Sequence, residues 1–191
     1  MKKCEFFESE IPYLGHLITK DGTKPDPKKI AVIKDWPTPT SVFDVRSFWG
    51  LANYFRKYIN HFSDMAAPLI NLTKGNITKR KSAKTGIQWS TECQKSFDEL
   101  KTALTSTSFL VMPDFSKPFE VITDASDFAL GAILLRDGKA VAYDSRVLNG
   151  AEKNYHTTDR ELLAVIHALK VWRCYLEGST FKVLTDHNPL C

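Results

Sequence analysis

The sequence predicts a mixed fold of helices and strands (α+β, or mixed α/β), in which a small hairpin and a helical region precede a partial sheet domain. Apolar segments on both sides of residues 124–127 predict two strands joined by a turn, and Asp137-Gly138 is typical of a tight hairpin leading into a third. Upstream, apolar residues recur at helical spacing after residues that commonly cap helices. With 191 residues, the chain is long enough for one large domain or two small ones.

Residues 1–20 contain the predicted hairpin. Its strands would lie within 3–18 on either side of a polar turn near Ser9. Gly15, inside the second strand, indicates a bulge or a close approach of the backbone. A further turn is expected at Asp21-Gly22.

Residues 21–108 form the predicted helical region. Asp26-Pro27 supplies a cap and a proline at the first helical position, so a short helix should run to about Asp35. Either Thr40 or Ser41 caps the next helix, and its apolar side chains at helical spacing are Val45, Phe48, Ala52, Phe55 and Ile59. Ser90 caps another helix, with Cys93, Phe97, Leu100 and Leu104 on one face. Residues 109–118, which contain two prolines, form the predicted linker.

Residues 119–191 hold the predicted sheet domain. The first strand ends at Asp124, the second covers about 130–136 and the third about 139–145. A long helix is expected from Asp159 to Glu177, stopped by Gly178. The fourth strand, about 181–185, should pair in parallel with the first. Asp144 lies on the third strand, where alternation suggests that it faces outward and has little functional weight.

Charge and cysteine content narrow the class of protein. The net charge is +4, but residues 1–90 carry +7 and residues 91–191 carry −3. A basic half beside an acidic half suits a nucleic-acid grip joined to a metal-dependent site, although a modest lysine excess is also common on ordinary surfaces. No segment is long and apolar enough for a membrane span or a signal peptide. The four scattered cysteines indicate reduced thiols in an intracellular protein, cytoplasmic or nuclear rather than secreted.

Three acids are the candidate chemical residues, and each has an ordinary structural alternative. Asp124 ends a buried strand and is followed by small residues, but it could simply stabilise a turn. Glu161 precedes an apolar helix face, but Thr158 and Glu161 also match a capping box. Asp186 ends the fourth strand, in a sequence that also favours a turn. Parallel pairing of the first and fourth strands would bring Asp124 and Asp186 to the same sheet end.

These acids lie in motifs that resemble a known family. Thr123-Asp124-Ala125-Ser126, Glu161-Leu162-Leu163-Ala164 and Thr185-Asp186-His187 resemble, in this order, the RNase H domain of gypsy-type long-terminal-repeat retrotransposons. Upstream segments are similar to the region joining the reverse-transcriptase palm to its thumb. They are Tyr13-Leu14-Gly15-His16, Lys24-Pro25-Asp26-Pro27, Asp35-Trp36-Pro37, Gly50-Leu51-Ala52-Asn53-Tyr54 and Trp89. Residues 1–20 then correspond to the end of the palm, 21–108 to the thumb and 119–191 to the first part of the RNase H domain.

The resemblance implies magnesium-dependent cleavage of RNA in an RNA–DNA hybrid. Asp124 would bridge two Mg²⁺ ions about 4 Å apart, and Glu161 and Asp186 would hold the ion on the leaving-group side, with Mn²⁺ as a substitute metal. Other residues would contact nucleic acid. These are Tyr13, Gly15 and His16 in the hairpin, Arg46, Arg56 and Lys57 in the thumb, Lys79, Arg80, Lys81 and Lys84 in a basic loop, and Ser126 and Arg146 in the sheet domain.

The sequence also departs from the family pattern. It starts after the Tyr-x-Asp-Asp loop of the polymerase and ends before the segment that carries a fourth acid, so it resembles a fragment truncated at both ends. We therefore expect no DNA synthesis, weak binding of a hybrid or duplex, and little or no cleavage. The exposed edge of the fourth strand could pair with a second copy of the chain. The alternative is a non-enzymatic nucleic-acid-binding or assembly module derived from a pol polyprotein.

Overall fold

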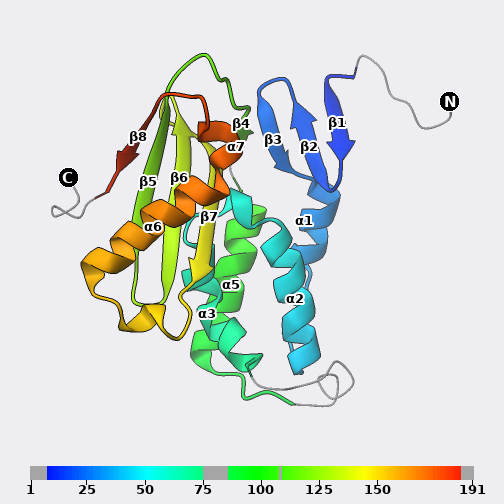
Figure 1. Ribbon diagram of the computed structural model, residues 1–191. Helices are drawn as coiled ribbons and strands as arrows, with labels where there is room; N and C mark the ends of the chain where they lie inside the picture. Colours follow the sequence, from blue (N-terminus) through cyan, green and yellow to red (C-terminus); the bar gives the residue numbers. More distant parts are fainter. Residues whose placement is uncertain (1–7, 75–85, 108, 186–191) are drawn as a thin grey trace.

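The computed structural model describes residues 8–74, 86–107 and 109–185 (Figure 1). It contains two four-stranded sheets, one with the order β1-β2-β3-β4 and the other with the order β7-β6-β5-β8. Helices α1, α2, α3 and α5 pack together, α3 contacts β6 and β7 of the second sheet, and α6 crosses β5 and β6 on the other face of that sheet (Figure 1). The predicted mixed α+β fold is confirmed. Within the described residues, no helix combines the length and hydropathy needed to cross a bilayer.

The first sheet differs from the predicted N-terminal hairpin. Strands β1 (Glu10–Tyr13) and β2 (His16–Thr19) are joined by a turn at Leu14 and Gly15, where φ is 46° and 73°. The expected turn near Ser9 is wrong, because Tyr13–Ile18 is not one strand but the corner of the hairpin, and residues 3–7 lie outside the described residues. The turn expected at Asp21-Gly22 does lead into β3 (Gly22–Pro25).

Strand β4 (Leu110–Val111) lies inside the segment predicted as a linker and completes the first sheet by pairing with β3. A Cβ added at Gly22 would lie only 1.9 Å from the backbone oxygen of Leu110. Only glycine therefore allows these two strands to approach each other as they do.

The capped helices follow the sequence closely. In α1 (Pro27–Lys34), the Asp26 carboxylate accepts a 2.9 Å hydrogen bond from the backbone nitrogen of Lys28. Ser41 and Asp44 form a capping box at the start of α2 (Val42–Tyr54), and Ser90 caps α5 (Thr91–Thr105). The predicted apolar faces of α2 and α5 are buried together in one core.

Two elements between these helices carry residues that matter below. A short 3₁₀ helix, η1 (Arg56–Tyr58), follows α2, so Arg56 and Lys57 lie outside the helix to which the sequence assigned them. Helix α3 (Phe62–Leu72), which has Pro68 inside it, was not expected from the sequence. Both elements contact β7 of the second sheet.

The second sheet has the predicted order and directions. Its strands are β5 (Phe119–Ala125), β6 (Ala129–Arg136), β7 (Lys139–Val147) and β8 (Phe181–Leu184), and β8 pairs in parallel with β5. The Asp137-Gly138 hairpin is confirmed, with φ of 47° and 70°. The single predicted helix is two helices, α6 (Thr157–Val171) and α7 (Arg173–Leu176), preceded by a 3₁₀ turn, η2 (Glu152–Asn154).

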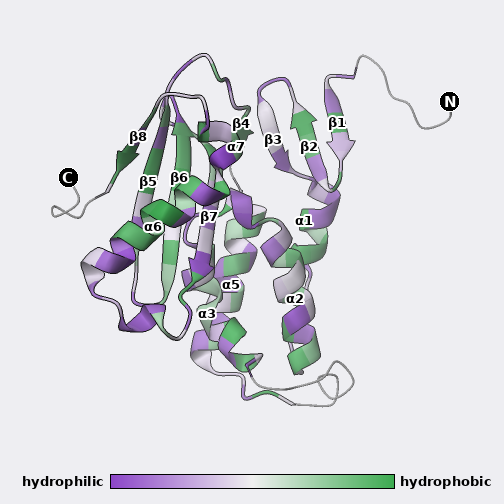
Figure 2. Cartoon of the chain, viewed as in Figure 1, coloured by the Kyte–Doolittle hydropathy of each residue, from purple (hydrophilic) through white to green (hydrophobic). Residues whose placement is uncertain are grey.

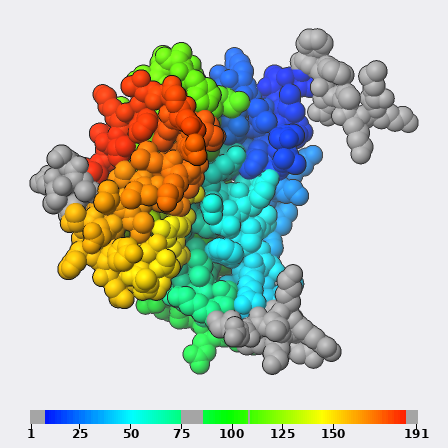
Figure 3. Space-filling model, viewed as in Figure 1, coloured from blue at the N-terminus to red at the C-terminus, as the bar shows by residue number. Residues whose placement is uncertain are grey.

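Alternate residues of β5 face different neighbours. Phe119 and Val121 pack in a core with Ala168 of α6 and Trp172. Ile122 and Asp124 alternate with these residues and line a hollow on the opposite face together with His61, which lies between η1 and α3. Figure 2 shows hydrophobic residues along β5 and β6. Figure 3 shows that the two halves of the chain are in continuous contact on the side of the molecule that faces the viewer.

Candidate nucleic-acid and metal site

Asp124 lies at the C-terminal end of β5, on the face turned away from α6. Its side chain is 51% exposed, and its Oδ2 lies 3.9 Å from Nδ1 of His61. The opposing residue on β6 is Gly131, whose missing side chain leaves space for the His61 ring. A hollow of about 50 Å³ beside this strand end is lined by Asp124 together with Ile122 and His61.

The turn after Asp124 is hydrogen-bonded to the helical half of the chain, by which we mean the region of residues 21–108. The Ser126 hydroxyl donates a 2.7 Å hydrogen bond to Asp64 Oδ1 of α3. The Ser126 Oγ also accepts a hydrogen bond from the backbone nitrogen of Ala129, and this bond closes the turn. Asp64 Oδ2 lies 3.9 Å from His61 Nδ1, so the His61 ring lies near two carboxylates. Ser126, predicted to contact nucleic acid, therefore has a local structural role as well.

Glu161 lies on α6 and is buried, with 4% of the residue exposed. It shares the inward helix face with Ala164, Ala168 and Trp172, as the spacing predicted. The predicted capping box is wrong: α6 starts at Thr157 after His156, so Glu161 is the fifth helical residue and lies beyond the reach of a cap. Glu161 thus lies on the helix that covers the Val121 face of β5, and Asp124 lies at the C-terminal end of that strand.

The third acid, Asp186, lies outside the described residues. The parallel register of β5 and β8 pairs Ile122 with Leu184, and each of these residues stands two positions before an aspartate in the sequence. Within the described residues, no group of three or more His, Cys, Asp or Glu side chains could hold a metal ion. The three-carboxylate site therefore stays a prediction.

The hairpin residues predicted to contact nucleic acid lie together at one turn. Tyr13 is 58% exposed, and Gly15 is the second residue of the turn. The His16 ring stacks on Tyr54, with centroids 5.3 Å apart and planes at 8°, and its Nδ1 lies 3.1 Å from the Tyr58 hydroxyl. Burial lowers the pKa of His16 below its ordinary range, and the Lys57 ammonium lowers it further.

The predicted cations differ in how much of their charge faces solvent. Arg46 donates to the backbone oxygen of Thr73. Lys57 lies 5.1 Å above the Tyr58 ring, and burial lowers the pKa of its ammonium. Arg146 makes two hydrogen bonds of 2.7 Å and 3.0 Å to Glu152, which lower the pKa of that carboxyl. Lys79, Arg80, Lys81 and Lys84 lie outside the described residues. A nucleic-acid role for these residues stays a prediction.

The expectation that Asp144 faces outward is wrong. Only 7% of the residue is exposed, and its Oδ2 lies 2.7 Å from His167 Nε2 of α6. Its Oδ1 pairs at 3.5 Å with Arg56, which reaches the carboxylate from η1. The carboxylate thus joins three elements from both halves of the chain. The sequence did indicate a polar partner for Asp144. His167 lies at helical spacing from Ala164 and next to Ala168, so it is near the inward face of the predicted helix.

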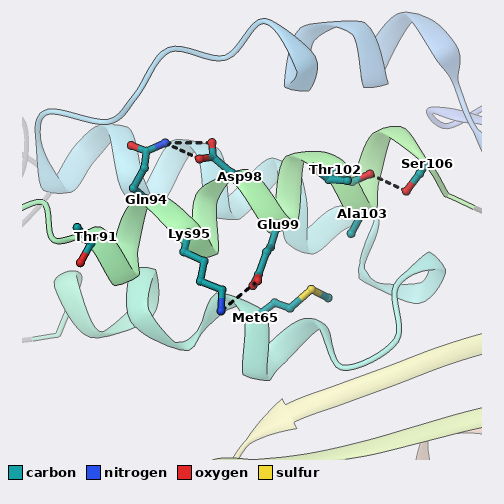
Figure 4. Close-up of a pocket in the computed structure, with 9 residues that line it drawn as sticks. All are labelled: Met65, Thr91, Gln94, Lys95, Asp98, Glu99, Thr102, Ala103 and Ser106. Atoms are coloured by element: carbon teal, nitrogen blue, oxygen red, sulfur yellow. Dashed lines mark hydrogen bonds and ion pairs between the residues drawn. The ribbon is translucent and has the colours of Figure 1, made fainter.

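A groove along α5 lies away from these residues. It has a volume of about 710 Å³ and runs along α5 beside Met65 of α3 (Figure 4). Its polar side chains pair with each other along the helix, Gln94 with Asp98 and Lys95 with Glu99. None of the predicted site residues lines this groove, so its size does not make it the candidate catalytic site.

The chain matches the model of a known family and several curated proteins. Residues 89–183 match the family described as the RNase H-like domain found in reverse transcriptase. The whole chain is 42% identical to the retrovirus-related Pol polyprotein from transposon opus of Drosophila melanogaster. Over 99% of its length it is 39% identical to the corresponding protein from transposon gypsy of the same fly. The chain spans only about a fifth of the length of these relatives.

Solved structures show the same arrangement of both halves. A foamy viral protease-reverse transcriptase in complex with an RNA/DNA hybrid matches 97% of this chain and 25% of its own, with a TM-score of 0.81 and 24% identity. A second structure of that viral protein, in complex with dsDNA, matches 98% of this chain and 38% of its own, with a TM-score of 0.78 and 25% identity. Residues 89–183 therefore match the RNase H-like domain found in reverse transcriptase, within a chain that is homologous over its length to the Pol polyproteins of gypsy-type retrotransposons.

Proposed function

We propose that this chain is the part of a Pol polyprotein that grips an RNA–DNA hybrid and supplies carboxylates for magnesium-dependent cleavage of its RNA strand. The observation that carries the proposal is the position of Asp124. It is a half-exposed carboxylate at the end of a central strand, beside a hollow, and a parallel strand leads toward the second predicted aspartate.

The donor set fits a magnesium site by its chemistry. Magnesium prefers carboxylate oxygens and keeps several waters, so it needs open space beside the acid. Asp124 offers a carboxylate that is half exposed, whereas Glu161 offers a buried carboxylate on the helix that covers the same sheet. We assign Asp124, Glu161 and Asp186 as the residues that would hold the metal, which would stabilise the charge that develops when a phosphodiester is cut.

The remaining residues would bind and orient the hybrid. The exposed ring of Tyr13 and the hairpin backbone face solvent on the helical half, which also carries the excess positive charge. Cationic side chains there would contact phosphates without reading sequence. The viral neighbours solved with dsDNA and with an RNA/DNA hybrid support this role. We expect the isolated chain to bind weakly and to cut slowly.

A labelled RNA–DNA hybrid tests both parts. The pure chain in excess should bind the hybrid, and nicking of the RNA strand should require Mg²⁺ and stop with a chelator. Because cutting by the isolated chain is expected to be slow, binding of Mn²⁺ followed by electron paramagnetic resonance gives a second readout. Asp124→Asn should weaken metal binding at least about tenfold and abolish nicking, while hybrid affinity remains.

Glu120→Gln is the matched control, since Glu120 lies on the same strand and the same face four residues earlier. It should leave metal binding unchanged. Hybrid binding without nicking, with metal affinity unaffected by Asp124→Asn, would instead support the alternative of a non-enzymatic nucleic-acid-binding or assembly module.

A further inference from the structure

The turn at Leu14 and Gly15 is held from outside the hairpin at both of its carbonyls. The Tyr54 hydroxyl, at the end of α2, donates a hydrogen bond to the Leu14 oxygen. The backbone nitrogen of Asp26 donates a 3.0 Å hydrogen bond to the Gly15 oxygen. Two separate elements of the helical half therefore fix the corner of this hairpin.

The backbone of the turn needs such support. Leu14 has φ of 46°, in the left-handed region, where the Cβ of a side-chain-bearing residue crowds the backbone. Residues in this conformation persist where surrounding contacts hold them, and they gather at functional positions. Nothing in the Leu14 side chain compensates, because it is 69% exposed and points away from the core.

The same tyrosine also holds the next residue. Its ring stacks on the His16 imidazole, and a Cβ added at Gly15 would lie 3.4 Å from its Cε1 atom. Phe55 meets the His16 ring edge-on at 5.8 Å, and Tyr58 contacts its Nδ1. Tyr54 thus contacts three consecutive residues, by its hydroxyl at Leu14 and by its ring at Gly15 and His16.

This support presents an apolar tip to solvent. Ile11, Tyr13 and Leu14 are 42%, 58% and 69% exposed and contribute nothing to the described cores. A hairpin that served only to close the sheet would gain stability by turning these side chains inward. A rigid aromatic tip is instead suited to stacking against a base or sugar of a nucleic acid strand.

We propose that Tyr54 is a positioning residue for nucleic-acid binding. It fixes the corner of the hairpin so that the Tyr13 ring and the Leu14–Gly15 backbone meet a strand of the hybrid at a set position on the helical half. This inference rests on the proposed function for its ligand, whereas the hold of Tyr54 on the turn can be measured without any ligand.

The test compares variants that each lose one hydroxyl. Tyr54→Phe keeps the ring stacked on His16 and removes only the bond to Leu14. Tyr155→Phe is the control, because it removes the hydroxyl of an exposed tyrosine that lies outside the hairpin, between η2 and α6. Amide hydrogen exchange of residues 13–16 and affinity for a labelled RNA–DNA hybrid are measured for the whole chain, and thermal unfolding verifies that each variant is folded.

Tyr54→Phe should speed exchange of these amides and weaken hybrid binding, each about fivefold, which is the usual net effect of one hydrogen bond. Tyr155→Phe should change neither, and Tyr13→Ala should weaken binding without changing exchange. Unchanged exchange in Tyr54→Phe would overturn the inference while leaving the proposed function intact. Absence of hybrid binding by the unmodified chain would overturn the proposed function, and the binding role of Tyr54 with it.

Discussion

Removing the Asp144 carboxylate should loosen the attachment between the two halves of the chain. Asp144 lies on the edge strand β7, between His167 on α6 and Arg56 on η1. Asp144→Ala would leave the mostly buried imidazole and the guanidinium without their shared acceptor. A buried group that loses its partner cannot be rehydrated fully, so the loss exceeds the net value of the bond itself.

The expected loss of unfolding free energy is about 2–4 kcal/mol. The hydrogen bond to His167 is 2.7 Å long and mostly shielded, and such charge-assisted bonds contribute about 1.5–3 kcal/mol. The Arg56 pair is longer, at 3.5 Å, and the Arg56 side chain is 46% exposed. Solvent screening reduces its share to the surface value of about 0.2–1 kcal/mol.

Equilibrium unfolding in urea, followed by tryptophan fluorescence, measures this loss from the midpoint and slope. Asp137→Asn is the control, because its pair with Lys117 is solvated on both sides, so the midpoint should hardly move. A loss below about 1 kcal/mol for Asp144→Ala would refute the reasoning, since it would mean that Asp144 is hydrated rather than shared between the two halves.

Four other predictions follow from single features. Because burial lowers the folded-state pKa of His16, the unfolded chain binds more protons between that pKa and about 6.5, so stability should rise with pH across this window. His16→Gln should remove that part of the pH dependence in urea titrations at pH 5 and 7.5. Gly22→Ala should cost about 3 kcal/mol or prevent folding, because its Cβ would overlap the Leu110 oxygen, and circular dichroism would detect either result. Replacing the basic loop residues with glutamine should make the plot of log binding constant against log salt concentration less steep, by about 0.9 in slope per lost phosphate contact. An unchanged slope would exclude the loop from the interface. These residues are Lys79, Arg80, Lys81 and Lys84. Strand β8 is exposed at all four residues, so self-association in sedimentation should rise with concentration and decrease in Val183→Lys; a monomer at every concentration would end the edge-pairing hypothesis.

Features set by neighbouring residues could be predicted from the sequence. Asp26, Ser41 and Ser90 cap their helices because a short polar side chain reaches a backbone nitrogen two or three positions ahead. Asp137-Gly138 forms its turn because both residues tolerate positive φ. The parallel pairing of β5 and β8 followed from the order of strand, hairpin, strand and helix.

Features set by distant residues could not be predicted. Leu14 adopts an unfavourable φ only because Tyr54, forty positions later, binds its carbonyl. Asp144 faces α6 rather than solvent because His167 and Arg56 offset the cost of burying its charge. Helix α3 tolerates Pro68 through packing between α2, α5 and the sheet, which no local pattern in the sequence reveals.

The candidate site also contains features that the sequence predicts and features that it does not. The inward face of α6 and the burial of Glu161 could be predicted from spacing alone. The proximity of His61 and Asp64 to Asp124 could not, because it depends on how α3 packs against the sheet.

The contact between Ser63 and Ser145 has a consequence for how such elements can evolve. The Ser145 hydroxyl accepts from the Ser63 backbone nitrogen at 2.9 Å and donates to the Ser63 hydroxyl at 3.0 Å, in a buried position between α3 and β7. Tyr143, two residues earlier, packs into the core of the helical half. A chimaera that joined the front of this chain to the back of a relative near residue 115 would separate these contacting side chains. Chimaeras of that kind should survive only when both parents carry compatible side chains at 63, 143 and 145.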